Sequence, residues 1–359
     1  MAVRTGALIE TLWIMIKTPY LLYLGSTVDP MAIKTSRGIA MFRAEDSIGE
    51  FVHGAGALSL GLPRMSFAEA AAAGAKTLIL GIANAGGTLS NELIDDCEAA
   101  LDAGLDIASG LHRRLRDEPR LVAAAKRQGR CLFDVRDASS DLPVGNGLPR
   151  GGRRLLTVGT DCSVGKMVTT LHLERAMRAR GIAADFRATG QTGILIAGSG
   201  VPLDAVVADF ISGAIEQLSP ARDDNGWDLI EGQGSLFHPS FAGVSTGLLH
   251  GAQADGIVIC HDPTRPHMRG LPHYAMPLLS DTIEANLRVA RLTSPDAVAL
   301  GIALNTSSLT REEAQDVCCR TAEETGLPTT DPVAFGVEEI IDRIEQCFGK
   351  SQQVKPPSA

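Results

Sequence analysis

The chain has 359 residues, of which 45% are hydrophobic, 21% charged and only 4% aromatic, and its formal net charge is -9 at neutral pH. This length is typical of about two globular domains. Few aromatic residues and 38 glycines favour layered α/β structure over an aromatic-rich sandwich. The acidic balance and the lack of a Lys/Arg block argue against nucleic acid as the main partner, and we expect a small-molecule substrate.

The cysteines and the apolar segments indicate the compartment. The cysteines are odd in number and form no C-x-x-C pair, so neither a disulfide framework nor a zinc ribbon is expected, and a reducing cytoplasm is the simplest location. The apolar stretch 12–16 is too short for a signal peptide. The run 193–215 contains Pro202, Asp204 and Asp209, which are costly in hydrocarbon, so no membrane span is expected.

Short apolar runs alternate with amphipathic segments, the pattern of parallel sheets covered by helices. In the first half we expect strands at 21–24, 77–82, 105–108 and 130–134, and helices at 66–73, 90–103 and 118–128. These elements predict a Rossmann-like α/β domain over residues 1–140. The glycine-rich turn at 81–87 lacks the full G-x-G-x-x-G spacing, so dinucleotide binding is not supported.

A change of composition predicts the domain boundary. Residues 141–153 are poor in apolar side chains and rich in Gly and Pro, so we interpret them as a linker. A second α/β domain is expected over 154–350, with a parallel sheet and a disordered tail at 351–359. Its strands are expected at 154–159, 183–188, 227–231, 256–260 and 297–304.

The strongest motif follows the first strand of the second domain. It is the loop Gly159-Thr160-Asp161-Cys162-Ser163-Val164-Gly165-Lys166, and Met167 then opens a segment of helical spacing. Its glycines permit backbone angles that turn amide N–H groups toward an anion, the helix N-terminus adds a positive dipole end, and the lysine adds a charge. This strand-loop-helix order predicts a P-loop-type domain that binds a phosphate-bearing ligand.

Two departures from the common P-loop pattern bear on the ligand. The spacing between the glycines is one residue longer than in G-x-x-x-x-G-K-[ST]. Met167 replaces the Ser/Thr whose hydroxyl normally contacts Mg²⁺, and a thioether is a poor ligand for a hard cation. Thr169 and Thr170 are possible substitutes. We expect no metal at this loop.

Ligands of open α/β sheets gather at the carboxyl ends of the strands, where this chain is polar. Arg187 either pairs with a substrate carboxylate or lies on the surface as an ordinary arginine. Thr189, Gln191 and Thr192 follow it on a loop that contains two glycines. Glu231 ends another strand before a glycine-rich turn, a usual position for an acidic metal ligand or a general base.

Three further residues are candidates. His238 is either a proton shuttle or a structural histidine. Arg265 lies in the segment 260–270, which holds two histidines and two arginines; their spacing matches no zinc pattern and favours anion binding. Asn305 ends the strand at 297–304 and either recognises an adenine edge or caps the following helix.

Long motifs together resemble the bacterial D-glutamate N-acetyltransferase family. They are Leu105–His112, Gly159–Met167, Arg187–Gly193 and Ile230–Pro239, and the similarity covers nearly the whole chain. The resemblance implies transfer of the acetyl group of acetyl-CoA to the amine of D-glutamate, in D-amino-acid catabolism. The second domain also resembles dethiobiotin synthetase, in which a threonine follows the loop lysine. An ATP-dependent ligase or kinase and a non-catalytic nucleotide-binding regulator therefore stay open as alternatives.

The resemblance suggests roles for the candidate residues. The loop from Gly159 to Met167, with Asn305, is expected to bind CoA without a metal. Glu231 is the first candidate base and His238 the second. Arg187 and Arg265 are expected to hold the substrate carboxylates, oriented by Thr189, Gln191 and Thr192. Direct attack of the amine on the thioester is the preferred route, with an acyl-enzyme on Cys162 as the alternative. A homo-oligomer is expected.

Overall fold

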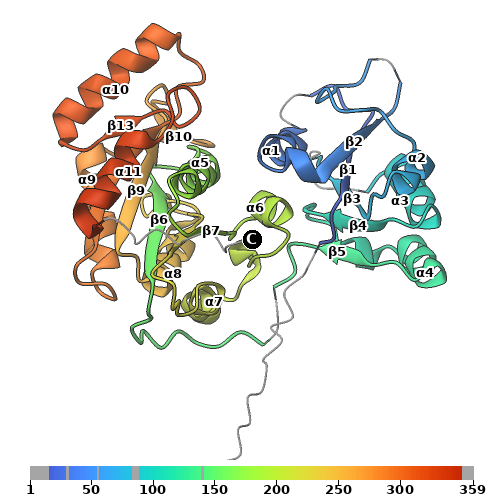
Figure 1. The fold of residues 1–359 in the computed structure, drawn as a ribbon, viewed down its shortest axis with the longest axis horizontal. Coiled ribbons are helices and arrows are strands. Elements are labelled where there is room, and N and C mark those ends of the chain that lie inside the picture. Colours follow the sequence, from blue (N-terminus) through green and yellow to red (C-terminus); the bar gives the residue numbers. More distant parts are fainter. Residues whose placement is uncertain (1–15, 30–31, 55, 83–88, 139–140, 350–359) are drawn as a thin grey trace, which may run out of the picture. The chain divides into compact units, whose positions relative to one another are not determined.

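The computed structural model describes residues 16–29, 32–54, 56–82, 89–138 and 141–349 (Figure 1). The chain forms two compact units. The first unit runs to Val135 and adds Gly198–Gly200, and the second comprises Arg136–Ala197 and the chain from Val201 onward. The tail at 351–359 and most of the turn predicted at 81–87 lie outside the described residues.

The first unit is a five-stranded parallel sheet with the strand order β2-β1-β3-β4-β5. Its strands are β1 (Tyr20–Gly25), β2 (Ser47–Val52), β3 (Thr77–Leu80), β4 (Asp106–Ser109) and β5 (Leu132–Asp134). Its helices are α1 (Lys34–Phe42), α2 (Phe67–Ala72), α3 (Asn91–Asp102) and α4 (Pro119–Gln128). The predicted strands and helices of this half are confirmed, whereas α1 and β2 were not predicted.

Local sequence signals set the ends of several helices. A capping box of Ser66 and Glu69 begins α2, since each side chain bonds the backbone amide of the other. Helix α4 carries Pro119 in its first turn and ends at Gly129, which has a φ of 61° in the left-handed region. These signals explain why the helix boundaries could be predicted closely.

The second unit is a six-stranded sheet with the order β13-β12-β9-β6-β8-β7, and all its strand pairs are parallel. The strands of this sheet are β6 (Arg153–Gly159), β7 (Ala184–Arg187), β8 (Trp227–Ile230), β9 (Gly256–His261), β12 (Val298–Leu304) and β13 (Thr329–Thr330). The helices are α5 (Lys166–Ala179), α6 (Gln191–Ala197), α7 (Ile211–Leu218), α8 (Ala242–Ala252), α9 (Leu279–Ala290), α10 (Arg311–Thr325) and α11 (Glu338–Phe348). Strands β10 (His267–Met268) and β11 (Leu271–Ala275) form a separate antiparallel pair.

Both faces of the second sheet are covered. Consecutive residues of β6, such as Leu155 and Leu156, are fully buried, although successive strand side chains point to opposite faces. Helix α5 packs against α11, and α8 packs against α7 and α9 (Figure 1). Burial on both faces makes the strands continuous apolar runs, which is why the sequence predicted them.

The strand order places a crevice beside β6. From β6 the chain runs through α5 to the edge strand β7, returns to β8, and then crosses to β9 on the other side of β6. Ligand sites of doubly wound sheets lie where the strand order reverses in this way. The residues that follow β6, β8 and β9 are therefore the natural components of a site.

The segment predicted as a linker is bonded to the second unit. The backbone amides of Asn146 and Gly147 donate to the Glu216 carboxylate at 3.0 and 2.8 Å. The Arg150 guanidinium donates to the carbonyls of Gly251 and Ser219 at 2.5 and 2.6 Å. None of the described helices is long and apolar enough to cross a membrane.

Candidate active site at the phosphate loop

The loop between β6 and α5 has the backbone of an anion cradle. Ser163 and Gly165 have φ angles of 53° and 101°, which turn successive N–H groups toward one side. Val164 points the other way, into the core, and is 1% exposed. The amide of Thr160 donates to the Cys260 carbonyl at 3.1 Å, which ties the loop to β9.

Lys166 is buried at the start of α5. Its Nζ donates to the Asp161 carbonyl at 2.8 Å, so the ammonium group lies beneath the loop. Burial lowers the pKa of this amine, and the nearby Cys260, Cys162, Asp161 and Glu231 oppose that effect. A buried cation with one carbonyl partner can bind an anion that enters the cradle.

The hydroxyl groups that the sequence offered in place of the missing Ser/Thr are engaged elsewhere. Thr170 Oγ1 lies 2.9 Å from Thr157 Oγ1 and donates to the Lys166 carbonyl at 2.8 Å. Thr169 Oγ1 lies 3.5 Å from the Cys260 sulfur. Both threonines are buried in the core, and Met167 stands half-buried at the usual magnesium-binding position.

Arg265 closes over the loop from the segment after β9. Its guanidinium donates to Asp161 Oδ2 at 2.7 Å and to the Cys162 carbonyl at 3.0 Å. The backbone amide of Arg269 also donates to Asp161 Oδ2, at 2.7 Å, and the Arg269 guanidinium contacts the Ser163 hydroxyl. Arg269, which sequence reasoning did not single out, therefore adds a second guanidinium at the loop.

Glu231 follows β8 and is 4% exposed. Its Oε2 accepts the amides of Thr189 and Gly190 at 2.9 and 3.0 Å. Burial raises the pKa of this carboxyl to about 7, although those two amides, the Lys166 charge and Gln233 all lower it. A carboxyl group with a pKa near neutrality is suited to proton transfer.

Glycines make room for this carboxylate and for the turn that follows it. A Cβ atom added to Gly193 would lie 2.2 Å from Glu231 Oε2, and one added to Gly232 would lie 1.7 Å from the Thr157 carbonyl oxygen. Thr189 Oγ1 donates to the Glu231 carbonyl at 2.6 Å and accepts from Gln233 at 3.1 Å. The loop after β7 and the turn after β8 thus form one hydrogen-bonded unit around Glu231.

His238 lies against the phosphate loop although it is 72 residues past Lys166 in the numbering. It is 3% exposed, its Nδ1 accepts the Ser240 amide at 3.2 Å, and its ring packs on Phe241. One of its ring nitrogens, Cys162 Sγ and a carboxylate oxygen of Asp161 lie within 4.8 Å of one another. Burial raises the pKa of the Cys162 thiol, while the Lys166 charge opposes that.

Arg187 occupies an ion-pair network on the sheet. Its Nη2 lies 2.9 Å from Asp228 Oδ1, and Asp228 is completely buried. The same carboxylate accepts Arg222 at 2.7 Å and the Ser219 hydroxyl at 2.6 Å. The guanidinium predicted to hold a substrate carboxylate therefore neutralises a buried aspartate in this structure.

The role of Arg187 can be tested by substitution with methionine, which keeps the apolar stem. We expect Arg187→Met to lower the free energy of unfolding by about 1–3 kcal/mol, because a buried charged acceptor loses a donor. Urea denaturation measures this change. A variant of unchanged stability that binds its substrate less tightly would instead support the role predicted from the sequence.

The remaining predicted residues lie at the edges of the site. Gln191 and Thr192 form the first turn of α6, directly after the loop that holds Glu231. The side-chain oxygen Oδ1 of Asn305 accepts the Ser307 backbone amide at 3.4 Å. The backbone amide of Asn305 donates to the His261 carbonyl at 2.8 Å. Asn305 thus stabilises the turn after β12, whereas Thr310 caps the following helix α10, so the predicted capping role of Asn305 is wrong.

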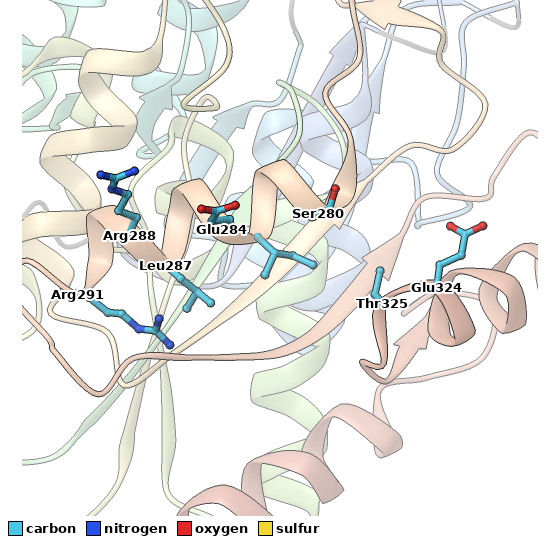
Figure 2. A pocket seen from close by; sticks show the side chains of 8 residues that line it. Ser280, Glu284, Leu287, Arg288, Arg291, Glu324 and Thr325 are labelled. Atoms are coloured by element: carbon cyan, nitrogen blue, oxygen red, sulfur yellow. The ribbon is translucent and has the colours of Figure 1, made fainter.

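A surface pocket is lined by residues other than those of this site. It has a volume of about 670 Å³ and is lined by residues of α9 and the end of α10. Figure 2 shows Glu284, Leu287 and Arg288 on α9, and Glu324 and Thr325 on a separate helix. None of the predicted site residues lines it, and we assign it no role.

The fold and the loop together define a two-domain α/β protein whose second domain is of the P-loop class. A family model described as a domain of unknown function, DUF1611_N, Rossmann-like domain, matches residues 47–138. The corresponding DUF1611_C P-loop domain matches residues 143–341. The chain belongs to this DUF1611 family, and the predicted Rossmann-like and P-loop domains are confirmed.

Two relatives match almost the whole chain. A protein of Tritonibacter scottomollicae called D-glutamate N-acetyltransferase is 50% identical over 331 residues, which is 92% of this chain and 99% of the relative. A protein of the same name from a Pseudoalteromonas species is 49% identical over 91% of this chain and 98% of its own length. The family resemblance inferred from the motifs is confirmed.

A solved structure of the same family has the same fold. The crystal structure of a DUF1611 family protein from Anabaena variabilis has a TM-score of 0.80 and 33% sequence identity. The match covers 92% of this chain and all of the other. The fold described above is thus shared with this family member.

Proposed function

We propose that this protein transfers the acetyl group of acetyl-CoA to the amine of D-glutamate. The observation that carries the proposal is the 50% identity, over nearly the full length, to a relative called D-glutamate N-acetyltransferase. The site supports it with an anion cradle and a buried carboxyl group of pKa about 7 on the neighbouring strand end. These are the parts needed to bind an anionic amino acid or cofactor and to move a proton.

In the proposed reaction the free amine attacks the thioester carbonyl and CoA leaves as its thiol. Glu231 is the first candidate to accept the proton of the substrate ammonium, because its neutral and charged forms are both populated near pH 7. His238 is the second candidate. Hydrogen-bond donors of the site stabilise the oxyanion formed on the thioester carbonyl.

The contacts around α5 argue against an ATP-dependent ligase or kinase. Such an enzyme needs a hydroxyl ligand for Mg²⁺ after the loop lysine. Met167 has none, and Thr169 and Thr170 direct their hydroxyl groups to the core. The chemistry of this donor set favours metal-free anion binding.

The anion held by the loop has two candidates in this reaction. One is the pyrophosphate of CoA, as the sequence predicts, and the other is a carboxylate of the amino acid. Lys166 and the backbone amides suit both, since each is an oxyanion. A kinetic comparison of the two substrates separates them.

Acetyl transfer is tested with purified protein, acetyl-CoA, D-glutamate and a chelator. We expect N-acetylglutamate by mass spectrometry, formed in equal amount to the thioester lost, and no consumption of ATP in a parallel reaction with ATP and Mg²⁺ in place of the chelator. Product detection is preferable to thiol reagents because Cys131, Cys319 and Cys347 are exposed free thiols. Consumption of ATP with Mg²⁺ and no N-acetyl product would favour the ligase, and tight nucleotide binding without turnover the regulator.

The setting of the reaction is also a proposal. We infer a role in D-amino-acid catabolism, in a reducing cytoplasm, by a homo-oligomer. All seven cysteines are free thiols, which suits a reducing compartment. Size-exclusion chromatography with light scattering measures the oligomeric state.

A further inference from the structure

Asp161 carries a buried oxygen atom without a partner. Its side chain is completely buried. Oδ2 accepts Arg265 and the Arg269 amide, each at 2.7 Å, whereas Oδ1 accepts no hydrogen bond from any residue that the structure describes. An unpaired buried carboxylate oxygen is costly, and native proteins rarely keep one without a ligand, ion or water. Oδ1 therefore calls for a donor from outside the chain.

The neighbours of Asp161 restrict what that donor can be. Cys162 Sγ and a ring nitrogen of His238 lie within 4.8 Å of an Asp161 carboxylate oxygen and of each other. A group placed among them meets a carboxylate, a sulfur and an imidazole. An ammonium group carries one positive charge and three N–H donors, and it can serve the carboxylate and the sulfur at once. His238 lines the place without accepting from it, because its Nδ1 already accepts the Ser240 amide.

A divalent metal ion fits this place less well. The Arg265 guanidinium is 2.7 Å from Asp161 Oδ2, and Lys166 Nζ is 2.8 Å from the Asp161 carbonyl oxygen. These two fixed cations, together with the Arg269 guanidinium at Ser163, repel a doubly charged ion about twice as strongly as a singly charged one at equal distance. The local charge thus favours an ammonium group.

We propose that Asp161 binds the α-ammonium group of the amino-acid substrate, through Oδ1, beside Cys162 and His238. The proposal rests on the function proposed above, since it takes the acetyl acceptor to be an amino acid. It names a binding residue that lies in the phosphate loop itself. The same loop then provides amides and Lys166 for a carboxylate of the same molecule.

This placement bears on the anion of the loop. The pantetheine arm of CoA separates its thioester from its pyrophosphate. An amine held on Asp161 must meet the thioester there, and the pyrophosphate then lies farther out. The amino-acid carboxylate is accordingly the anion that the loop holds.

The test compares two ligands that differ only in the amine. Glutarate has both carboxylates of D-glutamate but no ammonium group. By calorimetry, we expect the wild-type protein to bind D-glutamate at least about 10-fold more tightly than glutarate, because a charge-assisted hydrogen bond to a buried carboxylate is lost. In Asp161→Asn this preference should fall to within about threefold. An unchanged preference in the variant overturns the proposal.

A matched control separates binding from structural damage. Asp262 is the other carboxylate partner of Arg265, at 3.2 Å, and lacks the unpaired oxygen. Asp262→Asn should keep the full preference for D-glutamate. If Asp262→Asn loses the preference to the same extent, the effect comes from Arg265 and the proposal fails.

A ligand series on the wild-type protein keeps the proposal testable if Asp161→Asn does not fold. D-2-Hydroxyglutarate replaces the ammonium with a hydroxyl group and should bind about as weakly as glutarate; binding as tight as that of D-glutamate overturns the proposal. The readout also separates the two hypotheses. If binding prefers D-glutamate through Asp161 but no N-acetyl product forms, the proposed function is refuted and the ammonium site is retained. If Asp161→Asn transfers acetyl groups with an unchanged KM for D-glutamate, the proposed function is retained and the ammonium site is refuted.

Discussion

Replacing Glu231 with glutamine is expected to lower kcat by about 10²- to 10⁴-fold, the usual contribution of a general base. The amide keeps the size of the side chain and can still accept the Thr189 and Gly190 amides that Oε2 accepts now. It cannot take a proton from the substrate ammonium. Steady-state kinetics at saturating acetyl-CoA and D-glutamate measures the loss, and KM should change much less than kcat.

Glu174 provides a matched control. It is a second buried carboxylate of the same unit, and it accepts the Phe186 amide at 2.9 Å and Arg178 at 3.0 Å. Glu174→Gln should reduce stability but leave kcat near the wild-type value. If Glu231→Gln keeps wild-type turnover, the base is another group, and His238 is the next to examine.

The raised pKa of Glu231 also predicts a pH dependence of stability. The pKa of this carboxyl group is about 7 in the folded protein, against its ordinary value of 4.5, which we take for the unfolded chain. Above pH 4.5 the unfolded chain gives up this proton first, so the free energy of unfolding falls as pH rises from 4.5 to 7 and then levels off. The whole decrease in the free energy of unfolding is about 3 kcal/mol. Urea denaturation at pH 5 and pH 8 should show this difference in the wild type and lack it in Glu231→Gln.

Replacing Lys166 with methionine is expected to weaken the binding of one substrate by about 10- to 100-fold, because the anion of that substrate loses a buried charged donor. Methionine preserves the apolar stem of a side chain that is only 7% exposed. A raised KM for D-glutamate alone assigns the loop to the amino-acid carboxylate. A raised KM for acetyl-CoA alone assigns it to the pyrophosphate.

A second readout of Lys166→Met is the pH profile of activity. The Lys166 charge lowers the pKa of Glu231, so its removal should move the acidic limb of the profile upward. Lys126→Met, on the exposed face of α4, serves as the control. Unchanged KM values and an unchanged profile would contradict an anion site at the loop.

The sheets could be predicted because most strands are buried on both faces and appear as apolar runs. Strand β2 was not predicted from the sequence because Glu50 lies in its middle. That carboxylate is completely buried and accepts the Leu60 amide at 2.7 Å. A hydrogen bond from the loop that follows β2 satisfies the charge, and no strand pattern reveals it.

The sequence by itself determined the phosphate loop that Gly159 and Lys166 delimit, and it placed Glu231 at a strand end. A P-loop is contiguous, and its function follows from backbone angles and from the start of one helix. Parallel strands bring their carboxyl ends to one edge, so the candidate residues could be assigned to that edge before their contacts were known.

Only the tertiary structure decided which side chains are committed elsewhere. Arg187 pairs with Asp228, and Thr170 bonds Thr157, so neither offers its polar group to the loop. The structure also brought His238 to Asp161 and left one Asp161 oxygen unpaired. Pairing depends on distances between groups far apart in the chain, and these distances arise only when the strands and loops pack together.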